Sequence, residues 1–238
     1  MGRCIYLRKG EVHTLPVVGI KAGDLPIGQI VKLMEGGVET EFIVVNQGIP
    51  ENSSLYDASC NGTWLLRKDI KENRAYGSTT SYSTSTINTW LNGNYFNSLG
   101  SIEQKVIDQI KIPYVKGMGY SGSVESGVNG FSVKIFLLSG YEVGWTTNDS
   151  SAFPVDGAKL SYFIASTTGN TKRIAYLNGL ASRWYLRSPS TDNDDYIWSV
   201  LSEGGYNLYG ISGSEGIRPA LVIPSTSIFD PTTYLLKK

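Results

Sequence analysis

The sequence predicts an α+β domain in which two helices lie among many short antiparallel strands and long loops. Three observations indicate this class. Short apolar runs bounded by Gly and Asn recur along the chain and are typical of buried strands. Helical spacing of apolar residues occurs only between residues 83 and 112. The Gly- and Ser-rich loop 120–130 and a second loop at 146–158 are long, and long loops in a compact domain usually have a function.

In chain order, residues 1–26 are expected to form an extended arm that attaches the domain to a larger particle or to sister subunits. The domain itself is expected to span 27–225, with a ligand-display region at 184–219, and a tail is expected at 226–238. The expected strands are Glu41–Asn46, Thr63–Arg67, Lys134–Ser139, Arg183–Arg187, Tyr196–Val200 and Gly216–Ile223.

Two helices are expected between these strands. The first follows Ser and Thr capping candidates and is expected to end at Gly93. The second is expected to begin at Ser101, with Gln104 completing a capping box, and Pro113 prevents its continuation. The apolar stripes that define the two helices are Ile87, Trp90 and Leu91, and Ile102, Val106, Ile107 and Ile110.

The composition excludes several classes of function. Lys plus Arg and Asp plus Glu are both 21, so the net charge of zero gives no argument for binding nucleic acid or an anionic membrane. A single histidine, His13, and two cysteines, Cys4 and Cys60, are too few for a histidine-rich metal site or a disulfide-stapled scaffold. We expect reduced thiols, no signal peptide and no membrane insertion.

The stretch from Ser190 to Glu215 differs in composition from the rest of the chain. It holds five acids and four aromatic residues but no Lys or Arg, and Arg187 and Arg218 flank it. Tyr, Ser, Asp, Gly and Asn dominate it, as they do antibody loops, where Tyr supplies contact area at low entropic cost. The stretch is therefore either a binding surface or a solvated hairpin pair without a particular role.

Several motifs occur in a fixed order between about residues 27 and 224: Tyr56–Cys60, Thr63–Leu66, Ile87–Gly93, Lys111–Tyr114, Ile135–Ser139, Trp184–Pro189, Trp198–Val200 and Gly216–Leu221. Together they resemble a domain-of-unknown-function family that is common in gut Firmicutes and their prophages. The resemblance implies a C-type-lectin-like fold. It also implies a relation to the variable proteins of diversity-generating retroelements and, more distantly, to formylglycine-generating enzymes.

In retroelement variable proteins, C-terminal residues are rewritten at template adenines, so that AAY codons for Asn become codons for Tyr, Ser, Asp and similar residues. Twelve positions here are reachable in that way, whereas Glu203 and Glu215 are not. With Tyr185, these positions are the predicted ligand-binding residues: Tyr185, Asp192, Asp194, Asp195, Tyr196, Ser199, Leu201, Ser202, Tyr206, Leu208, Tyr209, Ile211 and Ser214.

Four residues around this region are expected to support it. Arg187 and Arg218 are expected to be partly buried, pairing with acids or capping carbonyl groups; the alternative is that they present a guanidinium to a ligand carboxylate. Trp184 and Trp198 are expected in the core. Tyr206 and Tyr209, in contrast, are expected to be exposed, because Gly-rich turns flank their hairpin.

The motifs of related enzymes and calcium-dependent lectins are absent. No Glu-Pro-Asn or Gln-Pro-Asp loop occurs, and no cysteine follows Cys60, whereas formylglycine-generating enzymes resemble one another in a late pair of active-site cysteines. Asp192, Asp194 and Asp195 could supply calcium ligands, but acidic surface turns are common. We therefore predict no metal, no cofactor and no enzymatic activity.

These observations predict a non-enzymatic display protein that binds a bacterial surface protein or glycan through residues 184–215. The resemblance implies a phage tail receptor-binding protein that contacts other virion tail proteins. It would be made in the bacterial cytoplasm and then reside on the virion or on a cell surface. A homo-oligomer is expected, with a trimer as one candidate. Two alternatives remain open: a structural decoration protein and, third, a glycan-acting enzyme.

Overall fold

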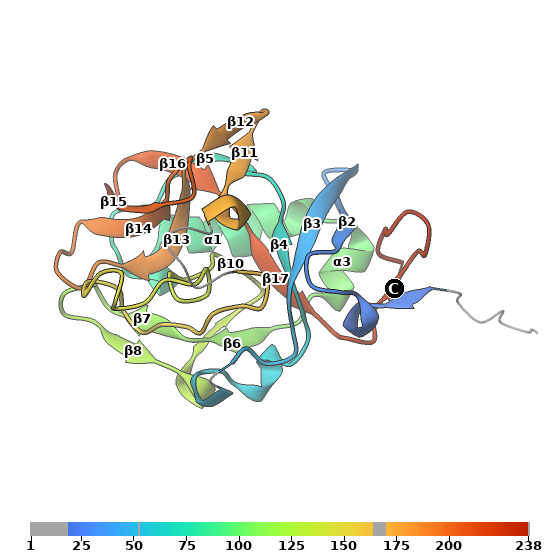
Figure 1. Cartoon of the computed structure of the whole chain (residues 1–238), viewed down its shortest axis with the longest axis horizontal. Coiled ribbons are helices and arrows are strands. Elements are labelled where there is room, and N and C mark those ends of the chain that lie inside the picture. The colour runs from blue at the N-terminus through green and yellow to red at the C-terminus, as the bar shows by residue number, and fades with distance from the viewer. Residues whose placement is uncertain (1–18, 52, 164–169, 238) are drawn as a thin grey trace, which may run out of the picture.

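Two five-stranded sheets organise the part of the chain that the computed structural model describes, which comprises residues 19–51, 53–163 and 170–237. The first sheet has the order β10-β17-β4-β3-β2 (Figure 1). Its strands are β2 (Ile30–Glu35), β3 (Val38–Gln47), β4 (Thr63–Arg67), β10 (Ile135–Phe136) and β17 (Ala220–Ile223). Buried and half-buried residues alternate along β2, as they do in a strand with one covered face, whereas every residue of β17 is buried.

The second sheet has the order β15-β14-β13-β16-β5 and carries the C-terminal region singled out by its composition. Its strands are β5 (Glu72–Ala75), β13 (Trp184–Pro189), β14 (Tyr196–Val200), β15 (Tyr206–Gly210) and β16 (Ser214–Ile217). Strands β13 and β16 are parallel, and the other neighbours are antiparallel. The hairpin β14–β15 therefore lies at one edge of this sheet.

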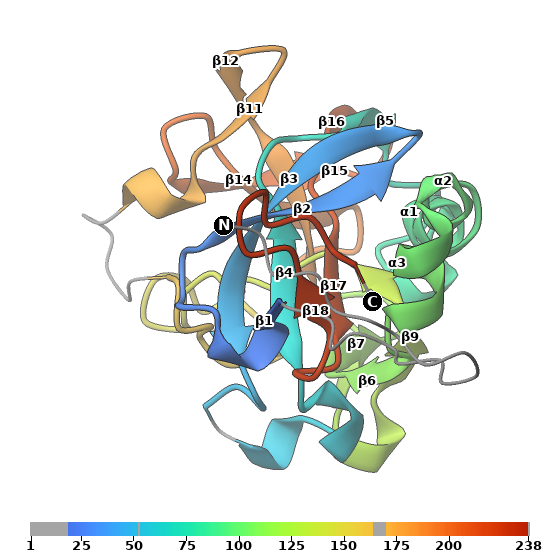
Figure 2. The same ribbon diagram turned by 90° about the vertical axis from the view of Figure 1, so that its right-hand side faces the viewer.

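Four two-stranded sheets complete the architecture (Figures 1 and 2). The hairpin of β11 and β12 projects from the body next to the second sheet. The pairs are β1 (Ile20–Lys21) with β18 (Ile228–Phe229), β6 (Ile110–Ile112) with β9 (Phe131–Val133), β7 (Tyr114–Lys116) with β8 (Ser123–Glu125), and β11 (Ala175–Leu177) with β12 (Leu180–Ser182).

The helical part of the described chain is small. It consists of α1 (Thr86–Trp90), a π-helical segment (Leu91–Tyr95), α2 (Phe96–Ser98) and α3 (Ser101–Val106). Short 3₁₀ turns lie at Ala22–Asp24, Ser53–Leu55, Ala58–Cys60, Tyr82–Thr84, Gly127–Asn129 and Asn170–Arg173. Among the described residues, no helix combines the length and apolar character needed to cross a membrane.

The predicted fold class is wrong. The protein is mostly β-sheet, with 36% strand and 17% helix, and its many small sheets do not form a two-helix C-type-lectin-like fold. The individual strands were easier to predict: Thr63–Arg67 and Tyr196–Val200 have the predicted bounds. The error concerns how the elements assemble, which local periodicity does not encode.

The expected helix ends also differ from the structure. Ser85 caps α1 as expected, because its hydroxyl accepts a hydrogen bond from the Asn88 amide at 3.2 Å. Gly93 does not end the helix, which widens into the π segment and continues to Ser98. Helix α3 has no capping box: the Gln104 side chain donates to the Leu99 carbonyl instead. The predicted stripe also breaks, because Ile110 lies in β6.

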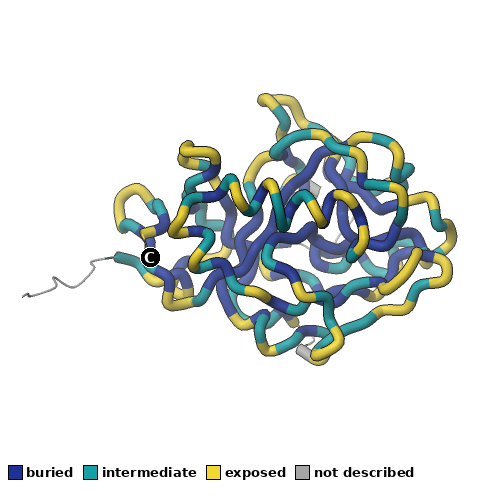
Figure 3. Tube along the Cα trace, turned by 180° about the vertical axis from the view of Figure 1, so that it is seen from behind, coloured by how far each residue is buried: buried dark blue, intermediate teal, exposed yellow. Residues whose placement is uncertain are grey.

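The core lies between the sheets and continues to both ends of the described chain (Figure 3). Trp64 on β4 contacts the Tyr56 and Phe136 rings edge-on, with centroids 5.7 and 5.5 Å away. Beyond residue 225, where a tail was expected, Phe229 and Leu236 are buried in the same core. The segment 226–236 is therefore part of the packed body, and residues 1–18 of the expected arm lie outside the described residues.

Candidate ligand-binding surface

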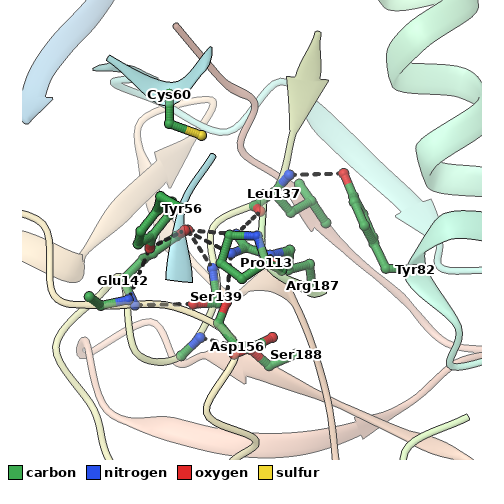
Figure 4. A network of polar contacts seen from close by, with 12 residues as sticks. Tyr56, Cys60, Tyr82, Pro113, Leu137, Ser139, Glu142, Asp156, Arg187 and Ser188 are labelled. Carbon is green, nitrogen blue, oxygen red and sulfur yellow. Dashed lines mark hydrogen bonds and ion pairs between the residues drawn. The ribbon is translucent and has the colours of Figure 1, made fainter. Parts of the chain in front are cut away.

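A buried ion pair holds the centre of β13 (Figure 4). Arg187 and Glu142 are both closed to solvent, and the Nη1–Oε2 and Nη2–Oε1 distances are 2.6 and 2.7 Å. The remaining Arg187 donors bind the carbonyl groups of Pro113, Leu137 and Asp156 at 2.8–3.0 Å. A guanidinium has five N–H donors, so Arg187 has none left for a ligand carboxylate.

Two further groups extend this network. The Tyr56 hydroxyl donates to Glu142 Oε1 at 3.0 Å and accepts a hydrogen bond from the Ala158 amide at 2.9 Å. The Ser188 hydroxyl donates to the Asp156 carboxylate, with oxygen–oxygen distances of 2.8 and 3.0 Å. Burial raises the pKa of Asp156 to about 7, although the Arg187 charge opposes that rise. The network joins β13 to the segments around Glu142 and Asp156.

Arg218 also lies in the interior, above the Trp184 ring. Its guanidinium carbon is 5.0 Å from the ring centroid, and Nε and Nη2 donate to the carbonyl groups of Arg67 and Lys68 at 2.9 and 3.0 Å. Nη1 has no hydrogen-bond partner. Burial lowers the pKa of Arg218 to about 10. This residue therefore caps carbonyl groups at the start of the turn that follows β4.

An aromatic cluster lies beneath the hairpin β14–β15. The rings of Trp198 and Phe153 stack with centroids 3.9 Å apart, and Tyr206 contacts both edge-on together with Trp145. The Tyr206 hydroxyl also donates to the Asp149 carbonyl at 2.7 Å. Tyr206 is half-buried and, contrary to expectation, is part of the framework. The cluster pins the loop 146–158 against the sheet.

The surface formed by residues 191–214, which we call the display face, contains two hollows. The first, the Ile211 hollow, has a volume of about 550 Å³. Three predicted ligand-binding residues line it: Asp195, Tyr196 and Ile211. Tyr196 is 40% exposed. The remaining lining residues are Gly77, Ser78, Gly210 and Ser212.

The second hollow, the Glu215 pocket, has a volume of about 300 Å³ and lies between the display face and β12. Three other predicted residues line it: Ser202, Tyr209 and Ser214. Tyr209, which was expected to be exposed, is half-buried. It contacts the Tyr185 ring, with centroids 6.2 Å apart, and Gly213, where an added Cβ would come within 2.2 Å of the Tyr209 ring. The remaining lining residues are Asn73, Ala181, Ser182, Arg183 and Glu215.

The other predicted residues have different surroundings. Tyr185 and Ser199 are fully buried, so neither can contact a ligand at the surface. The Asp194 carboxylate accepts a hydrogen bond from the Tyr120 amide at 2.8 Å and thereby fixes a neighbouring loop. Asp192 is exposed outside both hollows, and Leu201 and Leu208 are half-buried. Trp184 and Trp198, expected in the core, are buried.

Sequence reasoning missed residues that come from distant segments. Asn73 on β5 and Arg183 in the β12–β13 connection line the Glu215 pocket, and no local pattern links them to β15. Glu215 was not among the predicted contact residues, because a Glu codon cannot arise from an AAY codon by substitution of its adenines. A signal was nevertheless present, because an acid next to an apolar run is a candidate for a buried carboxylate. The predicted strand Gly216–Ile223 is in fact two strands, and Glu215 lies inside the first of them, β16.

Within 19–51, 53–163 and 170–237, no three side chains of His, Cys, Asp and Glu are grouped closely enough to hold a metal ion. His13 and Cys4 lie outside these ranges. Cys60 is a buried free thiol, and burial raises its pKa to about 12. The charged residues of the display face are Asp192, Asp194, Asp195 and Glu203, and Arg183 and Glu215 line the Glu215 pocket beside it.

Comparison with known proteins gives one family and no individual relative. No curated protein and no solved structure matches the chain. Residues 61–225 match the family model described as "Domain of unknown function (DUF6273)", and this range includes β4, both hollows and the Arg187–Glu142 pair. The chain belongs to this domain-of-unknown-function family, DUF6273.

Proposed function

We propose that the protein is a non-enzymatic binding protein that recognises a bacterial surface protein or glycan through its display face. One observation carries this proposal: six of the predicted contact residues line two hollows of the display face. They are Asp195, Tyr196 and Ile211 in the first hollow and Ser202, Tyr209 and Ser214 in the second. Binding sites are typically concave, with aromatic anchors and a few polar groups that set orientation.

The framework under this face supports the proposal. The Arg187–Glu142 pair and the Trp198–Phe153 stack fix β13 and β14 from below. A surface that is rigid before binding loses less conformational entropy when the ligand arrives, so the same contacts give higher affinity. The half-exposed Tyr196 side chain would serve as a contact of large area with few rotatable bonds.

Adsorption of the purified, labelled protein to candidate gut bacteria tests the proposal. The test variant carries Tyr196→Ala and Ile211→Ala, which remove apolar surface from the Ile211 hollow without touching the aromatic cluster. Truncation of one large side chain at an interface centre typically costs about 1 to 2 kcal/mol, so adsorption should weaken at least about tenfold. The control is Val128→Ala, a smaller apolar truncation at a side chain that is 73% exposed outside both hollows.

Adsorption of the double variant at the level of the wild type would contradict the proposal, provided that both proteins keep the same melting temperature. An equal weakening of adsorption in the Val128→Ala control would also contradict it, since the effect would then not belong to the display face.

We further propose that the protein acts on a phage tail and that a retroelement diversifies its display face. Eleven of the twelve AAY-reachable positions are at least partly accessible, and Ser199 is the buried one. Diversification acts on binding only where side chains can meet a ligand, so this distribution supports the proposal. Sequencing the gene from many phage isolates tests it, and substitutions spread evenly over the gene would refute it.

A further inference from the structure

Gly210 lines the Ile211 hollow from the last position of β15, where the fold does not require a glycine. Its φ is not positive, and an added Cβ would meet no atom within 4 Å. It is the first residue of a turn in which the Gly213 amide donates to the Gly210 carbonyl at 3.0 Å, a position open to most residues. Its register with β14 is unbroken, so it marks no bulge. Glycine in a strand otherwise indicates the close approach of another backbone or of a ligand, and no backbone approaches Gly210.

The space that Gly210 leaves open lies beside Tyr196. The two residues are register partners across β14 and β15, and residues opposite each other in an antiparallel pair project from the same face of the sheet. Tyr196 is exposed and Ile211 is half-buried, and both line the hollow. The hollow therefore combines an apolar wall with bare backbone next to it.

Three polar side chains of the same hollow are available to a ligand. In the described part of the chain, the Asp195 carboxylate and the hydroxyl groups of Ser78 and Ser212 make no hydrogen bond to another protein group. All three residues are exposed. A carboxylate accepts hydrogen bonds, whereas a hydroxyl group both donates and accepts them, so the hollow offers both kinds of partner.

The segments that carry these groups are joined through the Ile211 backbone. The Ile211 amide donates to the Asp195 carbonyl at 3.1 Å, and the Ile211 carbonyl accepts hydrogen bonds from the Tyr76 and Gly77 amides at 3.2 and 3.3 Å. Asp195, Ser78 and Ser212 each follow or adjoin one of these linked residues. Their positions are therefore set before a ligand arrives, which lowers the entropic cost of binding.

The charges of the hollow do not favour an ionic ligand. Asp195 is the one charged residue among the described residues that line it, so an anionic ligand meets an acceptor carboxylate and no cation. A cationic ligand meets a single exposed carboxylate, and water screens the attraction between exposed charges. A neutral ligand with several hydroxyl groups can use Asp195 as an acceptor and both serines as donors or acceptors.

A pyranose ring has the matching chemistry. Its C–H groups form an apolar face that packs against an aromatic ring such as that of Tyr196, and its hydroxyl groups donate and accept hydrogen bonds around the edge. The hollow has a volume of about 550 Å³, which lies within the usual range of sites for small ligands. It is thus large enough for a sugar ring to enter over Gly210.

We propose that the Ile211 hollow binds a pyranose ring of a neutral glycan, with the sugar over Gly210 and against Tyr196. Its hydroxyl groups bind Asp195, Ser78 and Ser212. The proposal rests on the proposed function and narrows it, because it makes a neutral glycan the preferred ligand over a protein or an anionic glycan. It also assigns a ligand contact to Ser78, which lies far outside residues 184–215 in the chain.

NMR titration of the ¹⁵N-labelled full chain tests this proposal. The neutral probes are the methyl pyranosides of glucose, galactose and mannose, the anionic probes are the corresponding methyl uronides, and n-butylammonium chloride is the cationic probe. At least one neutral glycoside should shift the amide resonances of Ser78, Asp195 and Ser212 saturably. The matching uronide should bind more weakly, because its carboxylate meets an acceptor, and butylammonium should not shift these resonances.

Two variants with matched controls locate the binding. Gly210→Val fills the hollow without a steric conflict, so it should weaken glycoside binding at least about tenfold at an unchanged melting temperature. Its control is Gly205→Val, the same change outside both hollows, where an added Cβ makes only ordinary contacts. Asp195→Ala removes a charged acceptor and should also weaken binding at least about tenfold. Its control, Glu203→Ala, removes an exposed acid outside both hollows and should leave binding unchanged.

Three results would each overturn the proposal. The first is that no neutral glycoside shifts the three amide resonances, and the second is that butylammonium or a uronide binds as tightly as the neutral glycoside does. The third is that Gly210→Val or Asp195→Ala binds the glycoside as the wild type does.

The two proposals fail separately. If no neutral glycoside binds while Tyr196→Ala with Ile211→Ala still reduces adsorption to bacteria, the sugar assignment is wrong and the proposed function stands. If a glycoside binds in the hollow while the double variant adsorbs normally, the sugar site is real and the proposed function is wrong.

Discussion

Glu142 and Arg187 face each other in a two-pronged ion pair that is closed to solvent, with N–O distances of 2.6 and 2.7 Å. The pair lies where β13 meets the turn that follows β10, and the same carboxylate accepts hydrogen bonds from Tyr56 and from the Ser139 amide. Both charges depend on each other, because neither can be hydrated without opening the core.

Replacement of Glu142 by Gln should therefore be strongly destabilising. It leaves the Arg187 charge buried and unpaired, and breaking a buried pair from one side typically costs about 3 to 5 kcal/mol. Urea unfolding followed by tryptophan fluorescence measures the free energy. Glu41→Gln, which breaks the exposed ion pair with Lys68, is the control and should leave the free energy of unfolding nearly unchanged. Equal effects of the two variants would argue against this role for burial.

Asp156 should make stability depend on pH. Its pKa is raised to about 7 by burial, whereas 3.8 is the ordinary value expected in the unfolded chain. Between these values the folded protein keeps a proton that the unfolded chain has lost, so this group's contribution to stability falls as pH rises and is flat above about 7.

Asp156→Asn removes that titration. The stability of the wild type minus that of the variant should therefore decrease from about pH 4 to about pH 7 and then level off. Urea unfolding of both proteins across this range measures the difference. A difference that stays constant with pH would show that Asp156 titrates normally in the folded state.

The turn between β14 and β15 depends on one glycine. Gly204 has φ of +85°, a conformation that costs other L-residues about 1 to 2 kcal/mol. Gly204→Ala should thus lower the free energy of unfolding by about that amount. The adjacent Gly205 has no positive φ, and an added Cβ would make only ordinary contacts at 3.7 Å, so Gly205→Ala should be neutral or slightly stabilising. Thermal unfolding of the two variants distinguishes these outcomes.

Tyr206 should contribute mainly to stability. Tyr206→Phe keeps the ring contacts with Trp198 and removes the hydrogen bond to Asp149, which is worth about 1 kcal/mol. Tyr206→Ala removes the ring as well and should cost about 3 kcal/mol. Chemical unfolding measures both changes. A Tyr206→Ala variant as stable as Tyr206→Phe would mean that the aromatic cluster does not hold the hairpin.

Local structure was predictable where a residue type strongly favours one local conformation or one capping role. The run Thr63–Arg67 is a strand because branched and aromatic residues occur between Gly and Lys-Asp turns, and Ser85 caps α1 because its hydroxyl replaces a missing acceptor. The predicted helix end at Gly93 was wrong. A glycine often follows the last residue of a helix, but Gly93 lies inside the π-helical segment.

The candidate site was predictable only in part, for a related reason. Composition found Tyr196 and Tyr209 because it reports what a loop contains. It could not separate them from Tyr206, whose contacts come from Phe153 and Trp145 on another segment. The parallel pairing of β13 with β16, which brings Arg183 towards Glu215, is likewise a long-range event without a local signature.

The pairing of β1 with β18 gives the protein a fixed polarity. Ile20 and Phe229 are register partners, so the two ends of the described chain meet at one pole of the long axis, whereas β14 and β15 lie at the other (Figure 1). A tether joined to either end would attach to the pole that carries β1 and β18. A label, a surface linker or a fused scaffold placed there would lie at the opposite pole from β14 and β15.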